Sequence, residues 1–306
     1  CPNSIVHEVI YDPQTQRASG VKVIDTETGE NLVFNAKVIF LCASAIATAS
    51  ILLQSKSERF PNGMGNDSGE LGHNIMDHHF KAGAFAEVDG FEDQYYKGRR
   101  PNGIYIPRFR NIGGATDQPN FKRGYGYQGG ASRGTYGDQI AEIGYGADLK
   151  DLVSRPGKWN MTLMGFGECL PYHENKMVLD YDHKDKWGLP TVTFDVEWKE
   201  NEWEMRKDMV QQAMEMLELA GYKNIRPWDD PGAPGLGIHE MGTARMGRDP
   251  KTSVLNENNQ IHAVPNVYCT DGSFMTSASC VNPSLTYMAF TARAANHAVN
   301  QIKMES

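Results

Sequence analysis

Several features that mark other classes of protein are missing from this sequence. The formal net charge of the 306 residues is −8, so there is no excess of Lys and Arg to neutralise nucleic-acid phosphates. No apolar run approaches the roughly 18 residues that a membrane-spanning helix requires. The longest apolar-rich stretch, 36–53, is broken by Ser44, Thr48 and Ser50. We therefore expect no nucleic-acid partner and no transmembrane segment in this chain.

The cysteine pattern argues against a disulfide framework and a structural zinc site. The five cysteines are an odd number, and none of them forms a CxxC pair. We expect buried free thiols, which fit a reducing compartment; the bacterial cytoplasm and the periplasm both remain open. His73, His78 and His79 lie near Asp77 in segment 71–80, but their spacing matches no zinc signature. We predict no metal there, and instead a polar, hydrogen-bonded turn near a cofactor.

The N-terminal residues have the pattern of an α/β unit. Residues 4–34 predict two successive hairpins, the first with Gly20 in its turn. The run 36–42 is continuously apolar, as in a strand buried in a parallel sheet, and leads through small residues into a helix near 51–53. Such a junction lets a cofactor approach the backbone, and tight helix–sheet packing explains it equally well.

From about residue 80 the pattern changes to short alternating segments among Gly, Pro and aromatic residues. This pattern predicts an antiparallel sheet with long loops. Within it, segment 121–136 contains Tyr127, Gln128 and Arg133, whose aromatic, amide and guanidinium groups suit a polyhydroxylated ligand. An exposed glycine-rich hairpin is the equally supported alternative. A helix is expected over 200–220, where four apolar residues recur at helical spacing: Val210, Ala213, Met214 and Leu217.

Asn282 and Pro283 mark the start of a long C-terminal helix. Asn is a favourable N-cap, and Pro suits the first helical position. The unbonded N–H groups at such a start stabilise an anion, although a helix start without a ligand has the same sequence. Apolar residues then recur on one helical stripe: Leu285, Met288, Ala289, Ala292, Ala295, Val299 and Ile302.

Two further groups precede this helix. Asp271 and Gly272 follow a predicted strand at 266–269, and ligands of open α/β sheets collect at that edge. Asp271 is placed to accept from cofactor hydroxyls, and Gly272 lets the backbone come close. Upstream, His239 lies in a glycine-flanked segment. If His239 lies near Asn282, a base and an amide donor are both directed at the same place, where a single ligand can contact them.

These segments resemble a known family. The run His239-x-x-Gly-Thr-x-Arg-Met-Gly247, then Asp271-Gly-Ser, then Asn282-Pro-x-x-Thr286, resembles the C-terminal signature of the glucose–methanol–choline (GMC) flavoprotein oxidoreductases. The segment Leu71-Gly-His-Asn-Ile-Met-Asp-His78 resembles an N-terminal motif of the same family. The resemblance covers nearly the whole chain in the right order and is weakest over 85–160.

The resemblance implies FAD as cofactor and a fold in two parts. An α/β, Rossmann-like but incomplete FAD-binding domain is joined to an α+β substrate domain built on an antiparallel sheet. Residues 1–80 would be the C-terminal portion of the FAD-binding domain, 81–225 the substrate domain, and 226–306 the return to the FAD-binding domain. The implied cofactor-binding residues are Val6, Asp271, Gly272, Asn282, Pro283 and Thr286.

The resemblance also implies a reaction. His239 would take the hydroxyl proton of an alcohol as the base, Asn282 would hold the substrate oxygen, and hydride would pass from C–H to the flavin N5. Likeness to pyranose oxidases and bacterial glucoside 3-dehydrogenases favours a sugar, glycoside or polyol, with a simple non-sugar alcohol as the alternative. Likeness favours a dehydrogenase over an oxidase, with a small subunit and a cytochrome or quinone acceptor as candidate partners.

The chain departs from the family in one respect. The N-terminal dinucleotide fingerprint G-x-G-x-x-G between a strand and a helix is absent, and the first residue is Cys1. We expect a fragment whose start lies upstream. The alternative function is accordingly that of a catalytically silent or binding-only product, for which purified 1–306 would show no yellow colour.

Overall fold

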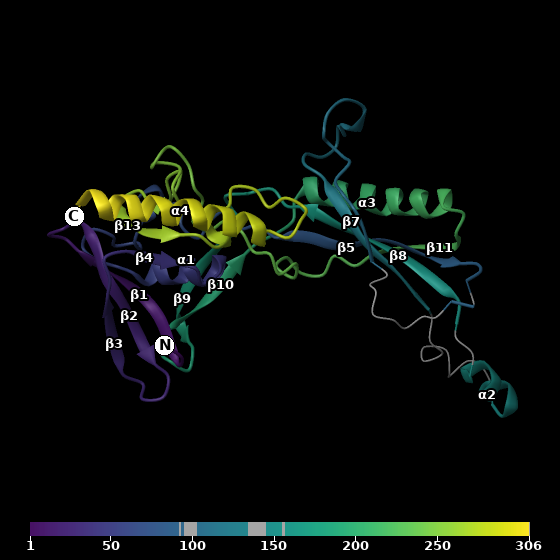
Figure 1. The fold of residues 1–306 in the computed structure, drawn as a ribbon, viewed down its shortest axis with the longest axis horizontal. Helices are drawn as coiled ribbons and strands as arrows, with labels where there is room; N and C mark the ends of the chain where they lie inside the picture. The colour runs from purple at the N-terminus through teal and green to yellow at the C-terminus, as the bar shows by residue number, and fades with distance from the viewer. Residues whose placement is uncertain (92, 95–102, 134–144, 155–156, 306) are drawn as a thin grey trace.

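The computed structural model describes residues 1–306 except 92, 95–102, 134–144, 155–156 and 306 (Figure 1). The molecule is elongated, with an N-terminal sheet at one end and a larger antiparallel sheet at the other (Figure 1). Both termini lie at the same end. Among the described residues, no helix is both long and apolar enough to cross a membrane.

The N-terminal sheet confirms the two predicted hairpins. Strands β1 (Ser4–Asp12), β2 (Arg17–Asp25) and β3 (Asn31–Asn35) pair antiparallel in that order. The prediction that Gly20 serves the first turn is wrong, because Gly20 lies inside β2. A Cβ at Gly20 would lie 2.2 Å from the carbonyl oxygen of Phe34, so the glycine is needed for close strand approach.

A small mixed sheet lies between two helices. Strand β4 (Ile39–Leu41) pairs parallel with β13 (Val264–Cys269), which pairs with β12 (Gln260–Ile261). The predicted parallel strand is therefore confirmed but is three residues long. Helices α1 (Ala45–Gln54) and α4 (Ser284–Glu305) lie on opposite sides of β4 and β13 (Figure 1). The carboxyl ends of β4 and β13 thus meet between two helices.

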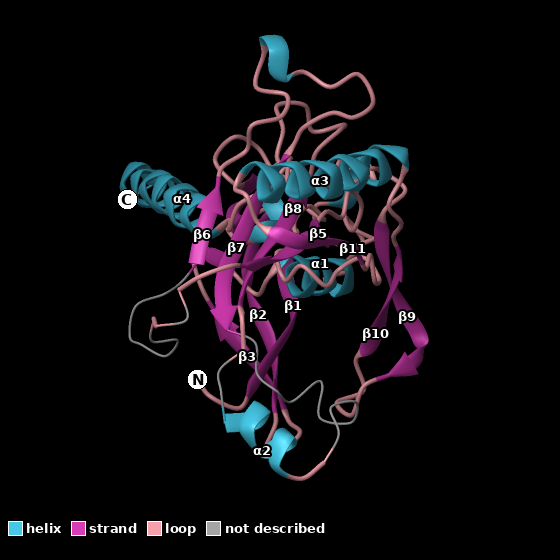
Figure 2. Cartoon of the chain, turned by 90° about the vertical axis from the view of Figure 1, so that its right-hand side faces the viewer, coloured by secondary structure: helices cyan, strands magenta, loops and turns pink. Residues whose placement is uncertain are grey.

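The larger sheet is the predicted antiparallel one. Its order is β11-β5-β8-β7-β6, and α3 (Glu200–Leu219) lies across one face (Figure 2). Its strands are β5 (His78–Val88), β6 (Gly103–Ile106), β7 (Tyr125–Arg133), β8 (Trp159–Glu168) and β11 (Lys223–Asp229). Helix α3 confirms the predicted helix. Four of its apolar residues are buried against the sheet: Met205, Met209, Ala213 and Leu217. Glycines let the helix approach, since a Cβ at Gly165 would lie 2.7 Å from the sulfur of Met209.

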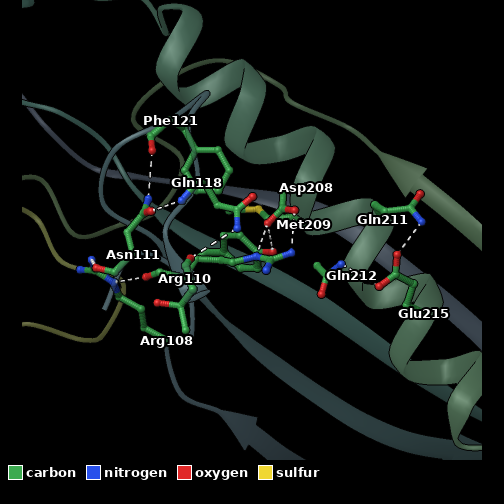
Figure 3. Close-up of polar contacts among 12 residues, drawn as sticks. Arg108, Arg110, Asn111, Gln118, Phe121, Asp208, Met209, Gln211, Gln212 and Glu215 are labelled. Carbon is green, nitrogen blue, oxygen red and sulfur yellow. Dashed lines mark hydrogen bonds and ion pairs between the residues drawn. The ribbon is translucent and has the colours of Figure 1, made fainter. Parts of the chain in front are cut away.

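A charged cluster ties the loop after β6 to α3. Both guanidinium nitrogens of Arg110 that face Asp208 donate to its carboxylate, at 2.8 and 2.9 Å (Figure 3). The Tyr125 hydroxyl donates to the same carboxylate. Arg108 donates to the carbonyl oxygens of Arg110 and Asn111, which fixes the loop's own course (Figure 3). Strand β6 consequently ends at Ile106, and the chain continues as this anchored loop.

The remaining elements are short. A separate hairpin of β9 (Lys176–Lys184) and β10 (Pro190–Asp195) packs against the first part of the chain, where Met177 shares the core around α1. Helix α2 (Ala147–Ser154) lies at the far end of the molecule (Figure 1). The 3₁₀ turns are η1 (Asn66–Ser68), η2 (Gly114–Thr116) and η4 (Gly272–Phe274).

Helix α4 begins one residue later than predicted and buries a different face. The carbonyl oxygen of Pro283 accepts from the N–H of Tyr287, so the helix begins at Ser284. Leu285 and Met288 of the predicted apolar stripe are 78% and 68% exposed. Alanines form the buried face instead, with Ala294 and Ala298 packed on Tyr268 of β13, because small side chains allow the helix to lie close to the sheet.

The cysteine prediction is confirmed for three of the five residues. All five are free thiols; Cys169, Cys269 and Cys280 are buried, whereas Cys1 and Cys42 are exposed. Burial raises the pKa of Cys280, so its thiol stays protonated near neutral pH.

Candidate active site

His239 and Asn282 lie side by side, although 43 residues separate them in the sequence. The Asn282 amide nitrogen lies 3.2 Å from Nε2 of His239. When this amide donates, Nε2 is the accepting nitrogen and the ring proton sits on Nδ1. His239 comes from the loop before the Met76–Met241 bridge, and Asn282 immediately precedes α4. The structure therefore brings together the two residues that the sequence singled out.

The polar turn predicted at 71–80 is present and holds the loop of His239. The Asp77 carboxylate accepts from the backbone N–H groups of His78 (2.7 Å), Gly237 (2.7 Å) and His239 (3.1 Å). Burial raises the pKa of Asp77, while these same N–H groups act in the opposite direction. Sequence reasoning missed this contact because it joins segments 160 residues apart. The feature of the sequence that could have indicated this contact is the acidic residue Asp77 within the motif of residues 71–78.

The three neighbouring histidines face different surroundings. His78 packs edge-on against His239, with ring centroids 4.9 Å apart. His79 lies under α3, where a Cβ at Gly167 would touch its ring, and His73 stacks on His173. Burial is the main cause, and the nearby His239 the second, of a pKa of His78 that is lowered to about 4. His78 is therefore neutral at physiological pH.

The predicted cofactor-side residues make internal contacts. The Asp271 carboxylate accepts from the Thr48 hydroxyl (2.5 Å) and the Ser273 N–H (2.9 Å), and the residue is only 8% exposed. Asp271 therefore connects α1 to η4 through these two hydrogen bonds. A Cβ at Gly272 would lie 2.4 Å from the carbonyl oxygen of Glu240, so this glycine brings the strand end against the loop of His239.

Val6 lines a cleft that extends along the whole of β4 and into the segment that follows it. The cleft has a volume of about 390 Å³ and is also lined by Leu41, Cys42, Ala43 and Ile51. Strand β4 is the edge of its sheet in the described part of the chain. At the start of α4, Pro283 is buried and Thr286 is half-buried.

The three predicted substrate contacts are placed very differently. Gln128 lies on the face of β7 opposite α3, because side chains alternate along a strand. Tyr127 faces α3, is fully buried, and donates its hydroxyl to the carbonyl oxygen of Met209. This corrects the assignment of Tyr127 as a substrate contact: it is a core residue.

The assignment of Arg133 also needs correction. Arg133 pairs with Trp159, at the end of the sheet remote from His78, which pairs with Glu168. The two positions are about 30 Å apart along β8, at roughly 3.3 Å per residue. Its guanidinium donates to the carbonyl oxygens of Gly157 and Gln94 and lies over the Trp159 ring. Arg133 therefore fixes the distal end of the sheet.

Tyr105 is a residue of the open face that sequence reasoning missed. It pairs with Gln128 across β6 and β7. A Cβ at Gly126 would lie 3.4 Å from its hydroxyl. Burial, and to a lesser extent the nearby Cys280, raise the pKa of Tyr105. Met164 and Phe166 occupy the same face of β8.

This fold and site define a class of flavoprotein. Residues 2–80 and 171–291 match the N-terminal and C-terminal family models described as GMC oxidoreductase, and the chain belongs to that family. The GMC oxidoreductases are FAD-dependent flavoproteins.

Individual relatives share the sequence over most of this chain. A 2-methyl-1,2-propanediol dehydrogenase from Mycolicibacterium austroafricanum is 32% identical over 92% of this chain and 51% of its own. The fructose dehydrogenase large subunit from Gluconobacter japonicus is 27% identical over 99% of this chain and 54% of its own. The chain thus spans about half the length of the curated relatives it matches.

Solved structures share the fold. Pyridoxine 4-oxidase from Mesorbium loti superposes with a TM-score of 0.62 and 17% identity, over 97% of this chain and 57% of that one. Formate oxidase gives a TM-score of 0.67 and 13% identity, over 99% and 61%. At these identities the likeness shows the fold alone.

The described residues fit one side of an FAD site. Small residues at the carboxyl end of β4 border the cleft lined by Val6, and such a junction suits close approach of a dinucleotide. Buried polar atoms without a protein partner, Nδ1 of His239 and Oγ of Ser273, lie near the start of α4 and next to Gly272. Exposed Leu285 and Met288 add an apolar surface on α4.

Proposed function

We propose that this chain carries the substrate-facing wall of an FAD-dependent dehydrogenase that oxidises a CH–OH group of a sugar, glycoside or polyol. The observation that carries the proposal is the contact between His239 and Asn282 at the start of α4. A base and an amide donor that meet at one point match the two needs of an alcohol: loss of its proton and fixation of its oxygen.

Each residue of the pair has one task in this mechanism. Nε2 of His239, the accepting nitrogen, takes the substrate hydroxyl proton. The Asn282 amide donates to the substrate oxygen and orients it without adding charge. FAD, when bound, would supply the acceptor for the substrate hydride. Asn282, Pro283 and Thr286 at the start of α4 would hold its ring, and the helix N-terminus there favours negative charge.

Val6, Asp271 and Gly272 complete the proposed cofactor contacts. Val6 would meet the adenine end through the cleft at β4. Gly272 would let the backbone approach, and Asp271 would accept through the carboxylate lone pairs that Thr48 and Ser273 leave unused.

The sugar preference is supported by Gln128 and Tyr105 on the open face of the sheet, since both side chains hydrogen-bond hydroxyl groups. Similarity to a fructose dehydrogenase large subunit agrees with it. A simple non-sugar alcohol is the second candidate, favoured by apolar Met164 and Phe166 on the same face and by similarity to a 2-methyl-1,2-propanediol dehydrogenase. A dye, cytochrome or quinone is the proposed acceptor, and a further subunit is a candidate partner.

Rapid mixing of the flavin-loaded protein tests the function. We expect fructose, glucose or sorbitol to bleach the flavin faster than 2-methyl-1,2-propanediol or ethanol, and a dye to reoxidise it faster than oxygen does. His239→Ala should slow bleaching by roughly 10²–10⁴-fold, the usual contribution of a positioned acid–base group. His183→Ala, an exposed histidine of β9, is the matched control. Unchanged bleaching by the His239 variant would remove it from the role of base.

The alternative of a silent fragment is tested separately. Under this alternative, purified 1–306 that has been incubated with FAD and desalted would show no flavin absorbance. A bound flavin spectrum would exclude the alternative.

A further inference from the structure

The loop that carries His239 contains a strained residue. Ile238 has a φ of 56°, in the left-handed region that β-branched residues rarely adopt. Packing does not hold it there, because Ile238 is 79% exposed. Strain of this kind persists only where neighbouring contacts over-determine the backbone.

One side chain binds the backbone on both sides of Ile238. Oδ2 of Asp77 accepts from the N–H of Gly237, and Oδ1 accepts from the N–H of His239. Oδ1 also accepts from the N–H of His78. A carboxylate held by such a concave set of N–H groups is an anion in a backbone nest.

The surrounding contacts fix the ends of the loop but not its middle. Met76 and Met241 exchange two backbone hydrogen bonds of 2.9 Å, which anchors the segment after His239. A Cβ at Gly237 would lie 2.5 Å from Oδ1 of Asp77, so this glycine is required for the carboxylate to come close. The direction in which His239 leaves the backbone therefore depends on the Asp77 bonds.

We propose that Asp77 is a positioning residue, whose carboxylate holds Ile238 in its strained conformation and thereby aims His239 at Asn282. The inference rests on the proposed role of His239 as base and deepens it. In this role Asp77 acts on the reaction through His239. Without its bonds, the backbone at Ile238 relaxes and the ring of His239 leaves its position beside Asn282.

Two single variants of the flavin-loaded protein and their double variant test this inference. Asp77→Asn replaces one accepting oxygen by an amide that faces an N–H donor. We expect flavin reduction at saturating substrate to slow by roughly 10- to 100-fold, the effect of a misplacement of about 1 Å, with KM changed less than threefold. Ile238→Gly alone should stay within twofold of the parent, because glycine adopts this conformation without strain. The double variant should regain at least fivefold over Asp77→Asn.

Amide hydrogen exchange supplies a readout that does not depend on turnover. Peptides covering 235–241 should exchange faster in Asp77→Asn, and peptides of β7 should not change. Asp25→Asn is the matched control, since Asp25 accepts from two backbone N–H groups in a remote turn. If Asp77→Asn does not fold, Gly237→Ala displaces the carboxylate by another route and should give the same exchange and the same slowing.

Each outcome separates this inference from the proposed function. Normal reduction by Asp77→Asn, slow reduction with unchanged exchange over 235–241, or no recovery in the double variant would each overturn the positioning role. If His239→Ala reduces flavin normally while Asp77→Asn still loosens the loop, the role of base fails and the structural part of the inference survives.

Discussion

Tyr127 and Gln128 are neighbours in the sequence but should respond to mutation in opposite ways. Tyr127 is fully buried beneath α3, and its hydroxyl donates to the carbonyl oxygen of Met209. Tyr127→Phe keeps the ring and its packing and deletes only this bond. A net contribution of about 1 kcal/mol is typical of such a bond, so the free energy of unfolding should fall by about that amount.

Gln128→Ala removes a side chain from the open face instead. The loss of one hydrogen bond to a substrate hydroxyl costs about 1.4 kcal/mol, which corresponds to a roughly tenfold rise in KM. Stability should change by less than about 0.5 kcal/mol, because no buried contact is lost.

Urea unfolding and steady-state kinetics of both variants decide the matter. We expect Tyr127→Phe to lower the unfolding free energy at unchanged KM, and Gln128→Ala to raise KM at unchanged stability. A raised KM for Tyr127→Phe with parental stability would restore Tyr127 as a substrate contact and refute the assignment of the two faces of β7. A parental KM for Gln128→Ala would remove the open face around it from the substrate site.

Two further predictions concern stability. Burial lowers the pKa of His79 to about 3 and that of His78 to about 4, so both rings are neutral in the folded protein. Their contribution to stability should be complete above pH 6.5 and fall below it by roughly 1.4 kcal/mol per pH unit for each histidine. His79→Leu should therefore remove about half of this slope in pH-dependent urea titrations. Asp208→Ala should lower the unfolding free energy by about 2 kcal/mol, between the values for buried and exposed pairs, because its bidentate partner Arg110 is 17% exposed. Asp67→Ala, which breaks the similar but more exposed pair with Arg59, should cost under about 1 kcal/mol, and equal losses for the two would contradict the argument from burial.

Local patterns predicted much of the fold. The paired strands of the first hairpins, the antiparallel sheet and α3 follow from alternation and helical spacing, which depend on near neighbours. Gly20 was misplaced because a turn and a close approach between strands both favour glycine. The apolar stripe of α4 was identified, but the buried face is the one with Ala294 and Ala298. Spacing alone does not say which face meets the sheet.

The pairing of His239 with Asn282 was predictable from the sequence, but the contacts that support it were not. His239 and Asn282 were found through their motifs, and the structure places them 3.2 Å apart. Tyr127 and Gln128 were both predicted as substrate contacts from their residue types alone. Which of them faces the core depends on the face of β7 against which α3 packs, and the sequence does not show that. Asp77 accepts a hydrogen bond from the backbone N–H of His239. A backbone N–H is common to almost every residue, so the sequence does not show which one a carboxylate will bind.

The contrast between His78 and His239 supports the choice of base. The two rings lie 4.9 Å apart, so protonation of one opposes protonation of the other. Burial holds the pKa of His78 at about 4, and this ring stays neutral while substrate is oxidised. Of these two histidines, His239 is the half-buried one in contact with Asn282, as the proposed role of base requires. A charged neighbour would oppose this transfer, and the burial of His78 prevents that charge from forming.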